Sequence, residues 1–425
     1  MESKSYWDFV EYFKHLGTRI LEFSDGVGLN LRKNWVFNSF SGLVMMGITI
    51  ILVLVMTYAY SYLFPISHPM ISSYATIPII NNSSNTQSQC NVFEGSWVKD
   101  ETYPLYHASQ CPFVEQGFNC LANGRKDGDY RKWRWKPRNC DIPKFNAKAM
   151  LEKFRGKRIV FVGDSMSRTQ WESLICLLMT GVEDKSSVYE INGNKITKKI
   201  RFLGIRFDSY NLRIDFYRSV FLVLPSGVPK RSPRRVKWTL GLDRLDNVAK
   251  EWIDSDVLIF NTGQWWTPGK LHATGGYFQV RGQLKLGMSI SSAFRTAVAT
   301  WASWVENSVN TNRTHVFFRT FEATSWSGRK RRVCKVTRFP LTNPQGRDRY
   351  HLSDIVLKTV KNMKVPVSVL HITPMTAFRS DAHVGIWRGN PSVPDCSHWC
   401  LPGVPDMWNE ILFYHMLSGF EDLHE

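Results

Sequence analysis

A short apolar run that ends on Gly163-Asp164-Ser165 constrains the fold of this chain more than any other feature. Residues 158–162 read Arg-Ile-Val-Phe-Val, and a helical pattern follows at 167–180. This order predicts a buried strand, a tight turn and a helix, as in an open α/β sheet. Such sheets bind ligands at the carboxyl ends of their strands, so we expect the hydroxyl of Ser165 at a ligand site.

A serine acts as a nucleophile only when a base can reach it. The C-terminal sequence Asp395-x-x-His398 offers a base and a carboxylate to orient it. A second Asp-x-x-His, at Asp348 and His351, offers the same residue types. A turn whose polar residues only cap the helix is the alternative interpretation of the Ser165 segment.

Apolar runs and helical stretches alternate after residue 158. The expected buried strands cover residues 158–162, 256–260, 315–319 and 365–372. The expected helices cover residues 167–180, 291–309, 352–363 and 405–417. This alternation predicts an α/β fold with a parallel sheet flanked by helices. Residues 198–224 are rich in β-branched and aromatic residues and predict an antiparallel β insertion.

Asn261 follows the second of these expected strands. An amide at the carboxyl end of a strand can donate a hydrogen bond to an oxyanion, as the backbone N–H of Ser165 also can. We therefore expect Ser165 and Asn261 to form an oxyanion hole, with a simple turn-forming role for Asn261 as the alternative.

A long uncharged stretch precedes the α/β pattern. No Asp, Glu, Lys or Arg lies between Lys33 and Glu94, and residues 41–64 are mostly apolar. At about 1.5 Å of rise per residue this segment is long enough to cross a hydrocarbon layer. Arg32 and Lys33 precede it and the next basic residue is Lys99, so the positive-inside rule places the N-terminus in the cytosol.

The sequence therefore predicts a single-pass membrane protein in three N-terminal parts. Residues 1–40 form a cytosolic tail and residues 41–64 a transmembrane helix. Residues 65–89, which are rich in Ser, Asn, Pro and Thr, form a lumenal stem. Glycosylation sequons at Asn81, Asn82 and Asn312 agree with a lumenal location.

All the cysteines lie after the predicted span. There are eight, an even number, so an oxidising compartment predicts four disulfides. They are Cys90, Cys111, Cys120, Cys140, Cys176, Cys334, Cys396 and Cys400. Their spacing lacks the paired Cys-x-x-Cys sets of zinc ribbons, and we expect no metal.

The chain has a formal net charge of +18, which indicates an acidic partner or surface. Residues 1–40 carry five basic and five acidic groups, so the excess belongs to the rest of the chain, with clusters at 230–235 and 329–332. Behind a membrane anchor we expect polysaccharide rather than nucleic acid as the partner, because aromatic faces stack on sugars and cations pair with carboxylates. A solvated basic surface is the alternative. The expected substrate contacts are Arg168, Trp265, Trp266, Arg331 and Arg332.

These motifs together resemble the SGNH hydrolase-like superfamily. More narrowly, residues 90–418 resemble the plant trichome birefringence-like family of Golgi polysaccharide O-acetyltransferases, including its PMR5-type N-terminal region. The matching motifs include Gly95-Ser96-Trp97, Asn123-Gly124-Arg125, Trp133-Arg134-Trp135, Gly163-Asp164-Ser165, Gln170-Trp171-Glu172-Ser173, Asn261-Thr262-Gly263 and Asp395-Cys396-Ser397-His398-Trp399-Cys400-Leu401-Pro402-Gly403.

The resemblance implies a type II Golgi membrane protein that moves acetyl groups onto cell-wall glycans. Ser165 would be the nucleophile, His398 the base and Asp395 the residue that orients it, in preference to Asp348 and His351. No cofactor is expected beyond an acetyl donor, whose identity the sequence does not indicate. An acetyl esterase with the same triad and a glycan-binding protein without activity are the alternatives.

The resemblance also implies a division of the chain and a disulfide pairing. A Cys-rich lobe would cover residues 90–157 and an SGNH-like catalytic domain residues 158–420, with a short tail at 421–425. The implied disulfides are Cys90–Cys140, Cys111–Cys176, Cys120–Cys400 and Cys334–Cys396.

Two departures from the family pattern affect the choice of glycan. The family often has His where this chain has Gln264, and a segment that is usually Gly-rich is basic here, at residues 327–332. Xylan, xyloglucan, mannan and pectin are all consistent with the resemblance. The positive charge favours an acidic glycan, either pectin or glucuronate-bearing xylan.

Overall fold

The computed structural model describes residues 90–327, 333–344 and 350–419. The predicted tail, transmembrane segment and stem lie outside these ranges, as does the tail at 421–425. The same holds for Asn81, Asn82, Arg331, Arg332 and Asp348. Within the described ranges no helix combines the length and the apolar character that a membrane span requires.

A seven-stranded sheet lies at the centre of the fold, in the order β15-β12-β9-β3-β6-β5-β4. The strands from β15 to β6 pair in parallel, and β5 and β4 are added antiparallel to their neighbours. Their bounds are β3 Arg158–Gly163, β4 Val188–Glu190, β5 Phe202–Phe207, β6 Leu212–Arg218, β9 Val257–Asn261, β12 His315–Arg319 and β15 Ser368–Leu370.

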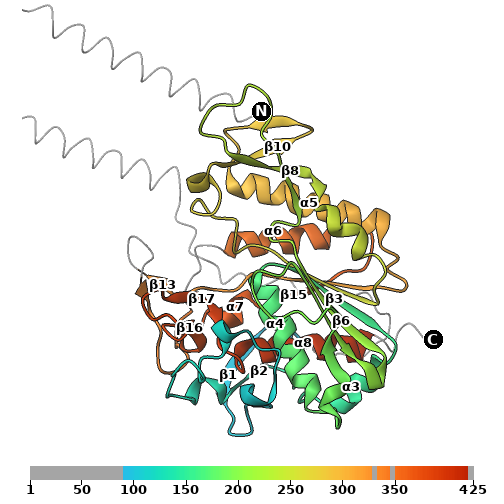
Figure 1. Cartoon of the computed structure of the whole chain (residues 1–425), viewed down its shortest axis with the longest axis vertical. Coiled ribbons are helices and arrows are strands. Elements are labelled where there is room, and N and C mark those ends of the chain that lie inside the picture. The colour runs from blue at the N-terminus through green and yellow to red at the C-terminus, as the bar shows by residue number, and fades with distance from the viewer. Residues whose placement is uncertain (1–89, 328–332, 345–349, 420–425) are drawn as a thin grey trace, which may run out of the picture. The chain divides into compact units, whose positions relative to one another are not determined.

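Helices cover both faces of this sheet. Helices α3, α4 and α8 lie on one face and α5 and α6 on the other (Figure 1). Their bounds are α3 Ala147–Lys153, α4 Ser165–Met179, α5 Ile290–Ser308, α6 Tyr350–Lys361 and α8 Val404–Gly419. Along β3, Ile159 and Phe161 pack toward α4 and α8, while Val160 and Val162 pack toward α5. Burial on both faces explains the continuous apolar run, and the predicted helix-flanked α/β fold is confirmed.

The antiparallel hairpin expected at 198–224 is present, but it is not an insertion apart from the central sheet. Strands β5 and β6 form an antiparallel hairpin, but β6 pairs in parallel with β3 and so belongs to the central sheet. A separate sheet follows instead, in the order β11-β10-β8-β7, and packs against α5. Its strands are β7 Val223–Ser226, β8 Trp238–Leu245, β10 Gly276–Val280 and β11 Gln283–Lys285. The strand expected at 365–372 is shorter, and its first residue is exposed because β15 lies at the sheet edge.

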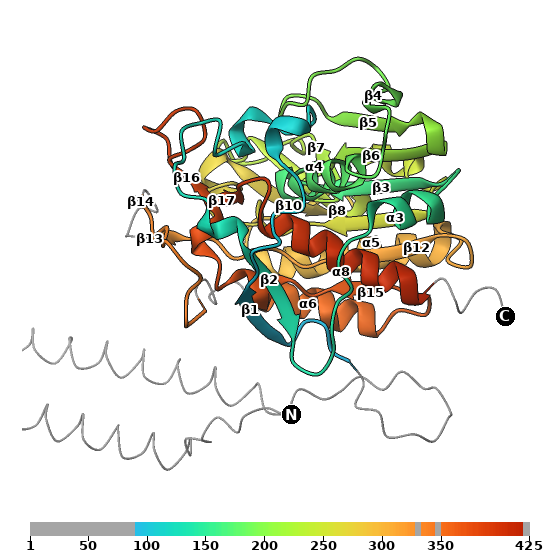
Figure 2. The same ribbon diagram turned by 90° about the horizontal axis from the view of Figure 1, so that it is seen from below.

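The N-terminal lobe contains an antiparallel pair, β1 Gly95–Lys99 and β2 Trp133–Pro137, and three short 3-10 helices. The pair lies on the α8 side of the central sheet (Figure 2). Trp135 is buried and donates a hydrogen bond to the carbonyl of Val92. Trp97 donates one to the carbonyl of Met375 in α7, Thr373–Thr376. These contacts make Trp135 part of the core rather than a surface for a ligand.

Four disulfides hold the lobe and the C-terminal segment in place, and they include all eight cysteines. Their pairing is the one that the resemblance implies. Cys90–Cys140 lies within the lobe, whereas Cys111–Cys176 joins the lobe to α4. Two more hold one short strand, β17 Asp395–Trp399, which pairs with β16 His383–Gly385. Cys396 bonds to Cys334 in β14, Val333–Cys334, and Cys400, directly after β17, bonds to Cys120 of the lobe.

Candidate active site

Ser165 lies at the turn between β3 and α4. Asp164 precedes the helix, and its carboxylate accepts a hydrogen bond from the N–H of Met166 at 2.9 Å, as a helix N-cap does. A Cβ atom at Gly163 would lie 2.6 Å from the carbonyl oxygen of Asn261, so only glycine allows β3 and β9 to approach this closely. The turn therefore places Ser165 at the carboxyl edge of the sheet, as the sequence predicts.

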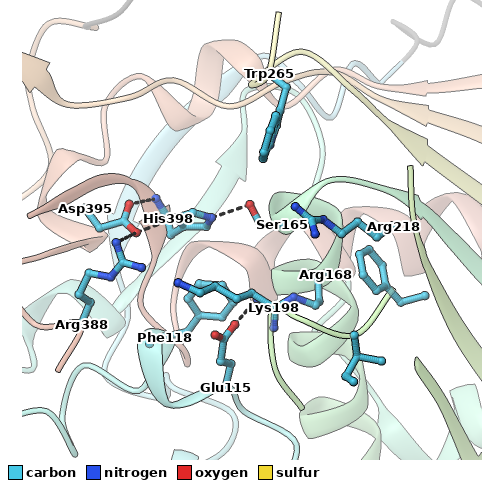
Figure 3. A pocket seen from close by; sticks show the side chains of 13 residues that line it. Glu115, Phe118, Ser165, Arg168, Lys198, Arg218, Trp265, Arg388, Asp395 and His398 are labelled. Atoms are coloured by element: carbon cyan, nitrogen blue, oxygen red, sulfur yellow. Dashed lines mark hydrogen bonds and ion pairs between the residues drawn. The ribbon is translucent and has the colours of Figure 1, made fainter. Parts of the chain in front are cut away.

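His398 and Asp395 reach Ser165 from β17 (Figure 3). Nε2 of His398 lies 2.6 Å from Oγ of Ser165, and Nδ1 lies 2.7 Å from Oδ2 of Asp395. A carboxylate at Nδ1 favours the tautomer that carries its proton there, which leaves Nε2 to accept from the serine hydroxyl. The three side chains thus have the contacts of a Ser-His-Asp triad.

Asp395 is held as a carboxylate. Burial alone would raise its pKa, but the charge and hydrogen bond of His398 outweigh burial and hold the pKa well below its usual range. The backbone N–H groups of Ser397 and His398 act in the same direction, by donating to Oδ1 at 3.2 and 3.0 Å. Arg388 adds a cation 3.6 Å from Oδ2. An ionised Asp395 can orient the imidazole and stabilise its protonated form.

Asp164 differs from Asp395 in its surroundings. Burial raises the pKa of Asp164 to about 6, and the negative charge of Glu322 adds to the shift. Glu322 is itself fully buried and forms an ion pair with Arg319.

Gln264 stands at the position where the family often has His. Its side chain donates to the carbonyl oxygen of Glu322 at 2.8 Å and does not line the cavity.

A cavity of about 160 Å³ lies in front of Ser165 (Figure 3). The N-terminal lobe, the segment before β5, strand β6 and the C-terminal segment all contribute to its walls. Its lining side chains include Glu115, Phe118, Ser165, Arg168, Lys198, Ile200, Phe216, Arg218, Trp265, Arg388, Asp395 and His398. The volume suits a small acyl group beside the hydroxyl that would carry it.

The predicted substrate contacts fall into three groups. Trp265 lines the cavity. Arg168 also lines it, but its guanidinium is engaged by the carboxylates of Glu115 and Glu172. The prediction for Trp266 is wrong: its side chain is only 2% exposed, packs in the core and donates to Thr262. Arg331 and Arg332 lie outside the described residues.

Asn261 lies at the end of β9, next to the turn that carries Ser165. Its side chain is buried, and its amide donates to the carbonyl of Arg319 at 3.3 Å. It is not among the side chains that line the cavity. Its role in an oxyanion hole, together with the N–H of Ser165, stays a prediction.

Other predicted residues lie away from the cavity. His351 is an exposed residue of α6, so it is His398 that the fold brings to Ser165. Asn312 is exposed. The basic side chains Lys230, Arg231, Arg234 and Arg235 are exposed in the connection between β7 and β8 and do not line the cavity. In the described part of the chain no group of three or more His, Cys, Asp or Glu side chains is arranged to hold a metal ion.

Sequence reasoning missed eight residues of the cavity wall: Glu115, Gly117, Phe118, Lys198, Ile200, Phe216, Arg218 and Arg388. Arg218 alone had a usable signal. It ends β6, and its backbone is opposite Gly163 in the parallel register of β3 and β6. An assignment of β6 to the central sheet would have placed Arg218 at the ligand-binding edge.

Comparisons with known proteins agree with this geometry. Residues 142–415 match the GDSL/SGNH-like acyl-esterase family found in Pmr5 and Cas1p, and residues 88–141 match the PMR5 N-terminal domain. The chain is 56% identical over 377 residues to the Arabidopsis thaliana protein trichome birefringence-like 7, a match that covers 89% of this chain and 84% of the relative.

Two further Arabidopsis relatives are more distant. Trichome birefringence-like 6 is 39% identical over 338 residues, covering 77% of this chain and 71% of the relative. Trichome birefringence is 37% identical over 360 residues, covering 81% of this chain and 59% of the relative. The part of the chain that contains Ser165, residues 142–415, therefore matches an acyl-esterase type of domain. The chain belongs to the trichome birefringence-like family.

Proposed function

We propose that this protein is an O-acetyltransferase that acetylates a plant cell-wall polysaccharide through an acyl-enzyme on Ser165. The observation that carries the proposal is the pair of contacts at His398, 2.6 Å to Ser165 and 2.7 Å to Asp395, inside a cavity. Membership of the trichome birefringence-like family and the acyl-esterase type of the domain support the same chemistry.

In the first half of the reaction, Oγ of Ser165 attacks the carbonyl carbon of an acetyl ester or thioester. The hydroxyl proton passes to Nε2 of His398, which Asp395 keeps correctly oriented. The bond between the acetyl carbon and the donor then breaks, and His398 returns the proton to the departing group. Ser165 is left as its acetyl ester.

In the second half, a sugar hydroxyl attacks the acetyl carbon while its proton passes to His398. The ester bond to Ser165 then breaks, and Ser165 recovers its hydroxyl proton from the imidazole. Negative charge on the carbonyl oxygen would be stabilised by the N–H of Ser165 at the start of α4, with Asn261 as the second proposed donor. Each such donor contributes about 3 kcal/mol in comparable sites.

The proposed location is the Golgi membrane, with residues 41–64 as a single-pass type II anchor and the described residues in the lumen. The uncharged apolar segment supports the anchor. The four disulfides support an oxidising compartment.

A hydrolytic esterase would use the same triad, and the difference lies in whether water or a sugar hydroxyl reaches the acyl-enzyme. The cavity wall favours transfer, because the N-terminal lobe places Phe118 over His398 with the ring centroids 5.3 Å apart. An apolar ring beside the base limits the space for water.

One assay separates the candidate functions. The purified full-length chain is incubated with an acetyl donor and a panel of glycan oligomers, and the products are identified by mass spectrometry. New ester on the glycan supports the transferase, and free acetate without glycan ester supports the esterase. Glycan binding without either product would show a binding protein and would overturn the proposal.

A further inference from the structure

Arg218 lies beside the nucleophile and enters the cavity from the neighbouring strand. It is the last residue of β6, and the N–H of Ser219 donates to the carbonyl of Gly163 at 2.8 Å. Its side chain lines the cavity, and its guanidinium is directed toward Ser165 (Figure 3). A ligand group held by Arg218 would therefore be close to the reacting hydroxyl.

The cavity holds more positive than negative charge. Its two carboxylates are already engaged, Glu115 with Arg168 and Asp395 with His398 and Arg388. Two cations are left over, Lys198 and Arg218. Within the described ranges of the chain, neither of their side chains forms an ion pair with a carboxylate or a hydrogen bond.

Arg218 is half-buried in this state. Burial lowers its pKa, and the positive charges of Arg201 and Arg168 lower it further. Partial removal of a cation from water without a counter-ion costs free energy, which an anionic ligand would recover. The arrangement is that of a site prepared for an anion.

An aromatic face adjoins this charge. Trp265 lines the cavity, and its ring has Arg218 at 5.8 Å and Lys270 at 4.6 Å from the centroid. Indole faces pack against the apolar face of a sugar ring. A sugar stacked on Trp265 would have cations within reach of its substituents.

A second hollow adjoins the first cavity at Arg218. It has a volume of about 310 Å³ and shares Arg218 with the first cavity. Arg201 and Asp246 also line it, as a long ion pair of 3.9 Å in which Arg201 stays 70% exposed. Arg218 therefore lies at the junction of two adjoining subsites, as suits a chain of several sugars.

We propose that Arg218 and Lys198 bind the carboxylate of a uronosyl unit in the acceptor, at or directly beside the sugar that receives the acetyl group. The proposal rests on the proposed function, because it names the acceptor class of the same site. It also moves the selection of an acidic glycan away from the basic sequence clusters at 230–235 and 329–332 and into the cavity.

The test compares binding of oligogalacturonate with binding of its methyl ester, which has the same sugars and no charge. Calorimetry with the purified full-length chain in a neutral detergent gives both dissociation constants without any turnover. We expect the acid to bind about 10-fold more tightly or better, as charge-assisted hydrogen bonds do, and added salt to reduce the difference. Equal binding of the two forms would overturn the proposal.

Variants locate the effect. Arg218→Gln and Lys198→Gln should each reduce the acid-to-ester preference, and the double variant should bring it close to one. Lys250→Gln is the matched control, because Lys250 is a 79% exposed cation that does not line either hollow. An acid-to-ester preference that survives in the double variant would also overturn the proposal.

A donor could supply the anion instead of the acceptor. If Arg218→Gln weakens binding of acetyl-coenzyme A and leaves the acid-to-ester preference unchanged, the cations serve the donor and the proposal falls. Failure of the subsite proposal can be told apart from failure of the proposed function. Preferential acid binding without acetyl transfer would support the uronate subsite and overturn the acetyltransferase function. Acetyl transfer without a preference for the acid would support the acetyltransferase function and overturn the subsite.

Discussion

The ring of Phe118 stacks on the imidazole of His398, with centroids 5.3 Å apart and an angle of 29° between the planes. Phe118 belongs to the N-terminal lobe, whereas His398 is near the other end of the chain. The backbone reinforces the contact, because the N–H of Leu401 donates to the carbonyl of Phe118 at 2.9 Å. The lobe is therefore part of the active site as well as a structural addition to it.

Replacement of Phe118 should affect the reaction more than the fold. In Phe118→Leu, we expect kcat for acetyl transfer to fall about 10-fold, since the base is less restrained, and the share of free acetate to rise as water enters. Product analysis measures both quantities. Phe145→Leu removes a ring of the same lobe that packs on Phe413, away from the cavity, and should leave the product ratio unchanged. An unchanged ratio in Phe118→Leu would contradict the proposed role.

Ser165→Ala should abolish acetyl transfer and leave the fold intact, because the variant removes only the nucleophilic oxygen of a small, partly buried side chain. We expect a loss of about 10⁶-fold in kcat, the scale seen when such a nucleophile is removed. His351→Ala is the matched control and should keep wild-type activity, since His351 is exposed on α6. Acetyl transfer at the wild-type rate by Ser165→Ala would end the assignment.

Asp395→Asn should preserve the shape of the site and impair catalysis. An amide in place of the carboxylate can donate to Nδ1 of His398 and favour the tautomer that cannot accept the proton of Ser165. Comparable changes in other Ser-His-Asp sites lower kcat by about 10⁴-fold. Circular dichroism checks the fold and steady-state kinetics the activity. A decrease in kcat of less than about 10-fold would contradict the role of Asp395.

Loss of the Cys334–Cys396 disulfide should both destabilise the protein and slow it. The bond closes a segment of 62 residues and fixes the strand that carries His398. In Cys334→Ser with Cys396→Ser, we expect the free energy of unfolding to fall by about 2–4 kcal/mol and kcat to fall as well. The Cys90–Cys140 double variant is the control, with a similar loss of stability and a smaller change in kcat. Free thiols at Cys334 or Cys396 in a non-reducing peptide map of the wild type would refute this account.

The free energy of unfolding should decrease as the pH rises toward 8, because the buried carboxyl of Glu410 is harder to ionise in the folded protein than in the unfolded chain. Burial raises the pKa of this carboxyl to about 8, although the hydrogen bond from Tyr103 acts in the opposite direction. The unfolded chain releases the same proton near pH 4.3, roughly the value of a free glutamate, so between these limits unfolding releases a proton and a higher pH favours it. Urea midpoints across a pH series should fall over this window and level off above it. Glu410→Gln should show a flatter profile, and an unaltered slope in that variant would exclude Glu410 as the cause.

Much of the central sheet could be predicted because its strands are buried on both faces. The run at Ile159–Val162 shows no polar interruption, and this pattern identifies a central parallel strand. The place of β6 in the central sheet could not be predicted in this way, because its sequence alternates polar and apolar residues. Its Asp215 is fully buried and neutralised by ion pairs with Arg158 and Arg213, each at 2.8 Å, which no local pattern reveals.

The candidate site was predictable only in part. From residues alone, His398 and His351 were equal choices as the base, and the family resemblance decided between them. Trp265 and Trp266 are adjacent and identical in type, yet one lines the cavity and the other packs in the core. Residues such as Phe118 reach the site only through the tertiary placement of the lobe, so they have no signal in the sequence.

The disulfide between Cys120 and Cys400 also sets an order of assembly on the ribosome. Its partners are 280 residues apart, and the later one emerges just after His398. Until then the nascent chain presents a serine without a base, and any bond that Cys120 makes is a wrong one that must later be exchanged. Catalytic competence therefore arises late, because the base is held over the serine only after the C-terminal segment has emerged and both of its disulfides can close.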